Sequence, residues 1–133
     1  MREFKLKILT PDGEIFSGDA YSLKVRCDGG DVEIMAAHQD LFASLGTGEA
    51  RLTTALGTRF ASTQGGFISV KGGECKMVAT TFEFAEDIDL NRARRAKEKA
   101  EEKLRTAQDE RAYKLAKMKL LRAQSRINVK MKG

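Results

Sequence analysis

The chain has 133 residues, of which 41% are hydrophobic and 32% are charged, and its formal net charge is +5. This composition is typical of one small folded unit, or of a small domain with an appendage, and it excludes wholesale disorder. No apolar run approaches the roughly 20 residues that span a bilayer, and the opening residues lack the apolar core of a signal peptide. We therefore expect a cytoplasmic protein that reaches a membrane only through partners.

Two parts of the chain differ in charge and in backbone-shaping residues. Residues 1–85 carry 9 basic and 11 acidic side chains, and residues 86–133 carry 15 basic and 8 acidic side chains. Of the 12 glycines, 11 lie at or before Gly73, and the only proline is Pro11. Turns and strands are therefore expected in the first part, and an acidic or phosphate-bearing partner is expected to bind the second.

Short strands follow one another in the first part. Hydrophobic and charged residues alternate over Phe4–Ile8, the turn Pro11–Gly13 follows, and Glu14–Ser17 returns as a hairpin. A second alternating run, Leu23–Cys27, ends in the turn Asp28–Gly30. Further candidate strands are 49–56, 58–63, 67–70 and 75–82, separated by Gly57, Gly65-Gly66 and Gly72-Gly73. This spacing predicts an all-β sandwich or barrel over residues 1–85.

The chain contains few cysteine and histidine residues, which are the types that most often act as nucleophiles and metal ligands. Cys27 and Cys75 both fall in strand-like runs without a CxxC motif, so we predict small buried residues of a reducing compartment. His38 is the only histidine, and two distant cysteines with one histidine do not form the usual four-ligand zinc set. No metal, required cofactor or catalytic residue is predicted.

The second part is predicted to form a helical hairpin over residues 86–133. Asp87 or Asp89 is placed to cap the first helix, and Asp109 is placed to cap the second. Small or apolar residues recur at helical spacing in both segments: Ala93, Ala96, Ala100, Leu104 and Ala107, then Ala112, Ala116, Leu120, Ala123 and Ile127. Outer-face ion pairs are expected at Arg94–Glu98, Lys97–Glu101 and Glu101–Arg105.

The hairpin is expected to be only weakly held. Alanine stripes let helices approach closely but bury little apolar area. The junction 106–109 contains neither glycine nor proline, so one continuous helix is also compatible with the sequence. Residues 90–128 would then extend over nearly 60 Å, at about 1.5 Å per residue. We therefore expect two arrangements of this segment, a docked hairpin and an extended form.

Three segments resemble the epsilon family of the bacterial F-type ATP synthase. They are Ile8–Gly18, which looks like the first hairpin of that family, Gln64–Val70, which looks like its glycine-glycine-aromatic strand, and Asp87–Ala93, which looks like its entry into the first C-terminal helix. The chain departs from the family at Ala36-Ala37-His38, where many members carry a proline two residues before the histidine.

The resemblance implies a non-catalytic rotor subunit at the cytoplasmic face of the bacterial plasma membrane. The sandwich would bind the gamma subunit and rest on the membrane c-ring. The helical segment would switch between folded and inserted positions among the alpha and beta subunits and restrain ATP hydrolysis.

The resemblance also implies a regulatory ATP site. Residues 88–93 are similar to the nucleotide-binding signature of ATP-responsive epsilon subunits, and two arginines match the pair on their second helix. The predicted ATP-binding residues are Ile88, Asp89, Arg92, Ala93, Arg122 and Arg126. Lys99 stands where some of those relatives have arginine. The alternative is a helix cap at Asp89 and a solvated basic face.

Two partner surfaces are predicted. An inhibitory contact with an acidic surface, in the family that of the beta subunits, is expected at Arg111, Lys114, Lys117, Lys119, Arg122 and Arg126. The gamma and c-ring interface is expected at Asp28, Gly29, Gly30, Asp31 and His38. The alternatives are a solubilising face for the first surface and an ordinary structural loop for the second.

Two other function classes are weighed against this one. The basic last third suits a nucleic-acid-binding module, but the strands lack interleaved aromatic and basic residues and the helices contain eight acidic residues. A coiled-coil adaptor is disfavoured because the stripes are alanine-rich and short. An enzyme is disfavoured because no nucleophile–base set and no phosphate-binding glycine loop occur.

Overall fold

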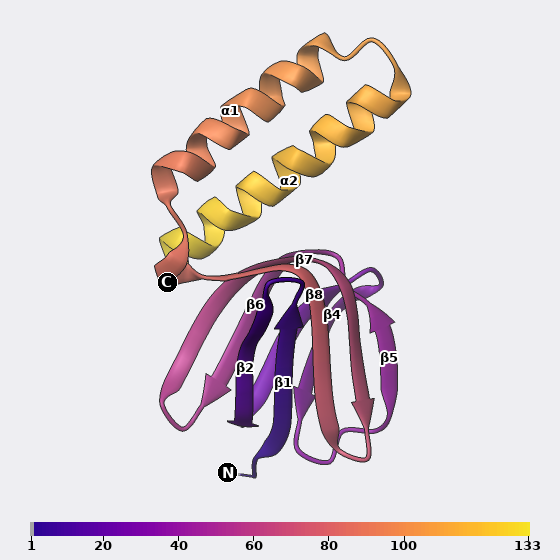
Figure 1. Ribbon diagram of the computed structural model, residues 1–133, viewed down its shortest axis with the longest axis vertical. Coiled ribbons are helices and arrows are strands. Elements are labelled where there is room, and N and C mark those ends of the chain that lie inside the picture. Colours follow the sequence, from indigo (N-terminus) through magenta and orange to yellow (C-terminus); the bar gives the residue numbers. More distant parts are fainter. Residues whose placement is uncertain (1) are drawn as a thin grey trace.

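The computed structural model describes residues 2–133 as eight strands followed by a short 3-10 turn and two helices (Figure 1). The elements are β1 (Phe4–Thr10), β2 (Gly13–Ala20), β3 (Ser22–Cys27), β4 (Gly30–Met35), β5 (Leu41–Ser44), β6 (Thr47–Thr54), β7 (Gly57–Lys71), β8 (Glu74–Phe84), η1 (Ala85–Asp87), α1 (Leu90–Thr106) and α2 (Glu110–Lys132). The predicted β-sandwich followed by a helical hairpin is confirmed.

Two long strands connect the layers of the sandwich. The strands lie in the order β2-β1-β8-β7-β6-β3-β4, and β5 adds to β7. The first half of β7 pairs with β6 and its second half pairs with β5, so β7 bends from one layer into the other. β1 runs parallel to β8, and the other pairs are antiparallel. Figure 1 shows β7 and β8 arching together below the helices.

The predicted break at Gly65-Gly66 is wrong, because β7 continues through both residues. Their φ angles are +66° and +99°, values that favour glycine. A Cβ atom built on Gly66 would lie 1.9 Å from the carbonyl oxygen of Val78 on β8. The two glycines therefore bend the strand where β8 passes against it, instead of ending it in a turn.

Two strands were not predicted. β4 follows the turn at Asp28-Gly29, and its charged outward residues, Asp31 and Glu33, hid the strand in the pattern. β5 has only four residues, and its sequence, Leu-Phe-Ala-Ser, does not alternate between apolar and polar residues. Both are set by pairing with a neighbour, β4 with β3 and β5 with β7.

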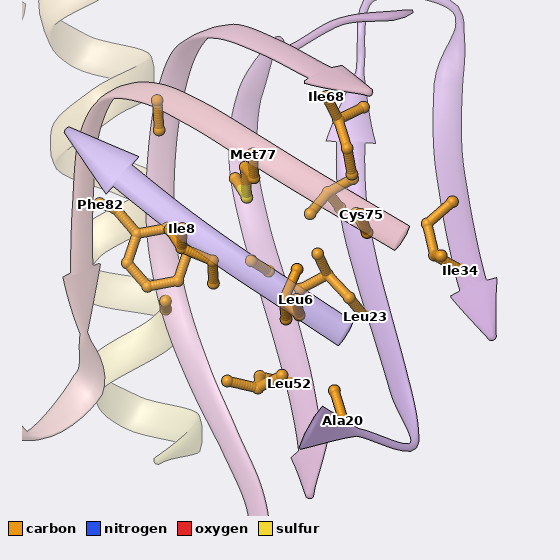
Figure 2. Packing of buried hydrophobic residues seen from close by; sticks show 14 of the residues in the cluster. Leu6, Ile8, Ala20, Leu23, Ile34, Leu52, Ile68, Cys75, Met77 and Phe82 are labelled. Atoms are coloured by element: carbon orange, nitrogen blue, oxygen red, sulfur yellow. The ribbon is translucent and has the colours of Figure 1, made fainter. Parts of the chain in front are cut away.

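The sandwich has a hydrophobic core of its own. On β1 the inward residues Phe4, Leu6 and Ile8 are buried, whereas Lys5 and Lys7 are exposed, as period-two alternation requires. Figure 2 shows Leu6 and Ile8 together with side chains from the facing strands. All members of this core lie between Phe4 and Phe84, so helix residues do not complete it.

The two cysteines are free and belong to that core. Burial raises the pKa of the Cys75 thiol to about 12. The pKa of Cys27 is also raised, first by burial and then by the nearby carboxylates of Asp28 and Asp31. Both thiols are therefore protonated near neutral pH, and the prediction that the cysteines are buried is confirmed.

Each helix of the hairpin begins at an aspartate that caps it. Asp89 Oδ1 accepts a hydrogen bond from the Arg92 backbone N–H at 3.1 Å, and Asp109 Oδ1 accepts one from Ala112 at 2.7 Å. Alanines between the helices are buried: Ala93, Ala100, Ala116 and Ala123.

The outer-face ion pairs differ from the predicted ones. Among residues 2–133 the pairs within the helices are Glu102–Arg105 and Glu110–Lys114. Arg105 thus pairs with a carboxylate three residues earlier instead of with Glu101. These side chains are long and exposed, so a charged residue can pair with any of several oppositely charged residues within one helical turn at nearly the same free energy.

Mostly polar contacts join α2 to the sandwich. One small apolar cluster consists of Ala85, Ile88 and Val129 with Phe60. The other contacts are a buried Ser62–Ser125 hydrogen bond of 2.9 Å, an Arg126–Glu83 pair, a Lys132–Glu49 pair of 2.9 Å and a 3.0 Å hydrogen bond from Lys130 to the Ala85 carbonyl. The start of α2 projects past these contacts (Figure 1). Leu115 and Met118 in this part of the helix are about half exposed.

Candidate functional site

A basic cleft of about 330 Å³ lies between α1 and α2. Its apolar lining consists of Ala96, Ala100 and Ala123, whose small side chains leave the space open. The remaining lining residues are all basic: Arg92, Lys99, Lys103, Lys119, Arg122 and Arg126. Six cations around one cleft without a lining carboxylate make a site for a ligand that carries several negative charges.

Helical spacing brings these cations together. Arg92, Lys99 and Lys103 are seven and four residues apart, which places them on the same side of α1 as the alanine stripe. Arg122 and Arg126 are four apart on α2. Because the hairpin is antiparallel, the start of α1 faces the end of α2. The planar guanidinium groups can each bind two oxygens of a phosphate, which an ammonium group cannot do in the same geometry.

Arg126 joins the cleft to the sandwich. Its side chain is only 13% exposed, and its Nε lies 2.8 Å from Oε1 of Glu83 on β8. Nη2 donates a hydrogen bond of 3.4 Å to Oε2, whereas the buried Nε–H has no aligned acceptor. The pair is therefore held mainly by charge, and Arg126 keeps hydrogen-bonding capacity that the protein does not satisfy.

The predicted ATP residues divide into two groups in the structure. Arg92, Arg122 and Arg126 line the cleft, and the sequence argument had placed these three together. Ile88 is 3% exposed in the apolar cluster with Val129, and Ala93 is fully buried. Asp89 caps α1. Ile88, Asp89 and Ala93 thus hold the start of α1 in place beside the cleft and are not among its lining residues.

Sequence reasoning missed Lys103 and Glu83. The signal for Lys103 was available, because it follows Lys99 by four residues on the face of the alanine stripe. Glu83 offered no such signal, since its pairing with Arg126 joins residues 43 apart in sequence. Lys119 had been assigned only to the inhibitory surface.

The predicted inhibitory surface is not one continuous face. Lys119, Arg122 and Arg126 line the cleft. Arg111, Lys114 and Lys117 are exposed on the first half of α2, where Lys114 pairs with Glu110 at 3.0 Å. The outward group of three lies around the exposed residues Leu115 and Met118, so this half of α2 is both basic and apolar.

The predicted gamma and c-ring residues lie at opposite ends of the sandwich. The turn at Asp28-Gly29 joins β3 to β4 at the end near Gly46 and α2, with Gly30 at φ +121° and Asp31 3.4 Å from Arg26. His38 lies beyond the other end of β4, where its Nδ1 is 2.7 Å from the Gln39 carbonyl oxygen. The six residues of β4 separate the two by about 3.3 Å per residue. The turn and His38 are therefore about 20 Å apart along β4.

The two helix caps allow a ligand role of Asp89 to be tested. Asp89→Ala and Asp109→Ala each remove one N-cap, so each should destabilise its helix by about 1 kcal/mol. If the Asp89 carboxylate also contacts a bound nucleotide, only Asp89→Ala should weaken ATP binding beyond the shared loss. Helix content by circular dichroism and ATP binding by calorimetry separate the effects. If the two variants bind ATP with equal affinity, Asp89 acts only as a helix cap.

Within residues 2–133, no helix is both long and apolar enough to cross a membrane. The same part of the chain contains no group of three or more histidine, cysteine or acidic residues placed to hold a metal ion.

The fold and the cleft define a class of protein, a β-sandwich that carries a helical hairpin with a groove lined by basic residues. Family models match both parts, "ATP synthase, Delta/Epsilon chain, beta-sandwich domain" over residues 3–85 and "ATP synthase, Delta/Epsilon chain, long alpha-helix domain" over residues 86–131. The chain belongs to the ATP synthase delta/epsilon chain family.

Curated relatives agree with this assignment. The chain is 35% identical to the ATP synthase epsilon chain of Bacillus velezensis over 129 residues, 97% of this chain and 98% of that one. It is 34% identical to the ATP synthase epsilon chain of Halalkalibacterium halodurans over 130 residues, again covering 97% and 98% of the two chains.

Solved structures share the fold at lower identity. A chain of the Euglena gracilis mitochondrial ATP synthase matches with a TM-score of 0.82 and 20% identity, covering 92% of this chain and 78% of that one. A chain in the central stalk and c-ring structure of the Tetrahymena thermophila mitochondrial ATP synthase matches with a TM-score of 0.61 and 14% identity, covering 98% and 96%.

Proposed function

We propose that this protein is a non-catalytic central-stalk subunit that couples the gamma subunit to the c-ring and restrains ATP hydrolysis through its helical segment. The observation that carries the proposal is the way the hairpin is attached. A sandwich with its own core holds a hairpin through one small apolar cluster and several polar contacts. Residues 1–85 thus serve as a rigid body and residues 86–133 as a movable regulatory arm.

ATP is the regulatory ligand in this proposal, and the protein requires no cofactor. The triphosphate lies against Arg92, Arg122 and Arg126, with Lys99 adding charge. Because these residues come from both helices, a bound polyphosphate holds α1 against α2. A ligand shifts the population toward the folded form if it binds the folded hairpin and does not bind the extended segment.

Inhibition follows when the arm leaves the sandwich. The exposed Leu115 and Met118 and the outward basic group Arg111, Lys114 and Lys117 then face an acidic surface of the alpha and beta subunits. ATP in the cleft opposes this movement, since it occupies Arg122 and Arg126. The contact is electrostatic, so inhibition should weaken as ionic strength rises.

The opposite ends of the sandwich serve different contacts in this arrangement. The end with His38 faces away from the hairpin and suits the c-ring, whereas the Asp28–Asp31 turn lies near the hairpin. The protein is peripheral at the cytoplasmic face of the bacterial plasma membrane, held there through gamma and the c-ring. Nucleic acid is not a partner.

Titration of an epsilon-depleted alpha–beta–gamma complex tests the proposal. The full chain should inhibit ATP hydrolysis, and added salt should relieve part of that inhibition. A version ending at Ala85, which retains the whole sandwich core, should bind without inhibiting. Binding of both versions without inhibition by either would leave a coupling subunit whose arm has another purpose. If neither version binds, the stalk assignment fails for this chain.

A further inference from the structure

Two lysines of the basic cleft lie outside the site proposed for ATP. Lys103 on α1 and Lys119 on α2 line the cleft, whereas the triphosphate is assigned to its arginines. Because the hairpin is antiparallel, the two lysines lie toward the turn between the helices and the arginines lie toward the sandwich. A second cavity, of about 350 Å³, shares both lysines and continues to the turn residues 106–109. The basic groove therefore extends beyond the position given to ATP.

The row of cations is longer than a triphosphate. Arg92 and Lys103 are eleven residues apart on α1, which corresponds to about 16 Å along the helix axis. On α2, Lys119 and Arg126 are seven residues apart and follow the same cleft over about 10 Å. A triphosphate covers only part of this length. Of the six cations only Arg126 is partly buried and the others are exposed, so a linear anion can lie along the open side of the groove.

The protein itself does not neutralise these cations. Lys99 and Lys103 are four residues apart on α1, and Arg122 and Arg126 are four apart on α2, a spacing at which like charges destabilise a helix. Among residues 2–133, only Arg126 of the six lies within 4.0 Å of a carboxylate. A polyanion from outside the chain would relieve both repulsions. Each phosphate that it places beside a further cation adds to the binding free energy.

The lining suits phosphate groups and does not suit nucleobases. The nine residues that line the cleft within the described chain are all alanine, lysine or arginine. Ammonium and guanidinium groups only donate hydrogen bonds, which matches the acceptor oxygens of phosphate. Stacking on aromatic rings supplies much of the affinity for single-stranded nucleic acid, and none of these nine residues is aromatic. The ligand is therefore selected by its charge and length.

We propose that the cleft binds linear inorganic polyphosphate that is longer than a triphosphate. The chain of phosphates lies along the groove from Arg126 beside the sandwich to Lys103 and Lys119 near the turn. The inference rests on the proposed function, because the same cleft holds ATP and because a ligand that contacts both helices keeps the hairpin folded. Inorganic polyphosphate therefore competes with ATP and keeps the regulatory arm folded as ATP does.

Calorimetry with the full-length chain tests the proposal, with tripolyphosphate and a linear hexaphosphate as the probes. The hexaphosphate should bind about tenfold more tightly, because it reaches two further exposed cations. The Lys103→Gln, Lys119→Gln double variant should lose about tenfold in hexaphosphate affinity and much less in tripolyphosphate affinity. Its helix content by circular dichroism should not fall, since the change removes the repulsion between Lys99 and Lys103.

A matched double variant controls for the loss of two positive charges. Arg94→Gln with Lys117→Gln removes one exposed cation from each helix, and neither residue lines the cleft. This variant should bind the hexaphosphate as the unmodified chain does. A loss equal to that of the Lys103→Gln, Lys119→Gln variant would mean that the whole basic surface attracts the anion, and the proposed polyphosphate site would be overturned.

The remaining outcomes separate this inference from the proposed function. If ATP binds and the hexaphosphate binds no more tightly than tripolyphosphate, the polyphosphate proposal is overturned and the regulatory role of ATP stands. If the hexaphosphate binds as expected and ATP does not, the polyphosphate proposal stands and ATP is not the regulatory ligand. If neither binds, both are overturned. If a single-stranded oligonucleotide displaces the hexaphosphate with equal or higher affinity, the cleft recognises nucleic acid and the polyphosphate proposal is overturned.

Discussion

Gly66→Ala should prevent the sandwich from forming its native strand crossing. The new Cβ atom would lie 1.9 Å from the Val78 carbonyl oxygen and 2.9 Å from the Ala79 Cα, so it overlaps backbone and not the end of a flexible side chain. The φ of +99° adds strain for any L-residue with a side chain. We expect a loss of more than about 4 kcal/mol in the free energy of unfolding, which is enough to unfold a small domain.

A matched glycine provides the control. Gly72 also has a positive φ, +59°, but a Cβ atom there meets nothing within 4 Å. Gly72→Ala should therefore cost only the conformational strain, about 1 kcal/mol. Urea unfolding followed by circular dichroism gives both values. Similar losses at the two positions would show that the crossing at Gly66 relaxes, contrary to the rigid packing of β7 against β8.

Removing the two arginines of α2 should abolish ATP binding. Arg122 and Arg126 line the cleft together, and each hydrogen-bonded charge contributes about 1.5–3 kcal/mol. The Arg122→Ala, Arg126→Ala double variant should therefore lose at least about a hundredfold in affinity by calorimetry. Because Arg126 also pairs with Glu83, the double variant should in addition hold its hairpin less firmly.

Single variants distinguish loss of a ligand contact from loss of docking. Arg122→Ala removes a cleft cation that forms no ion pair among residues 2–133, so its effect reports on the ligand. Lys117→Ala changes an exposed cation of the same helix outside the cleft and should leave the affinity unchanged. Retained affinity in Arg122→Ala would remove that residue from the site. An equal loss in Lys117→Ala would point to helix stability as the cause.

Much of the architecture was predictable because its determinants are local. The alternation over Phe4–Ile8 corresponds to a strand with one buried face. Asp89 and Asp109 begin helices because their side chains satisfy backbone N–H groups three residues later. Part of the cleft was also predictable, since Arg122 and Arg126 share a helix face by spacing alone. Short β5 was not, because its existence depends on pairing with β7.

The sequence by itself determined both helices and most of the strands, the division in charge between the first 85 residues and the rest, and the presence of paired arginines on one helix face. These follow from periodicity, capping and composition, which act over a few residues. Only the tertiary structure decided that Gly65-Gly66 bends a continuous strand, that Glu83 holds Arg126, and that Asp28 and His38 lie at opposite ends. Each of these depends on contacts between residues distant in the chain, which the packing of the sandwich selects and no local pattern encodes.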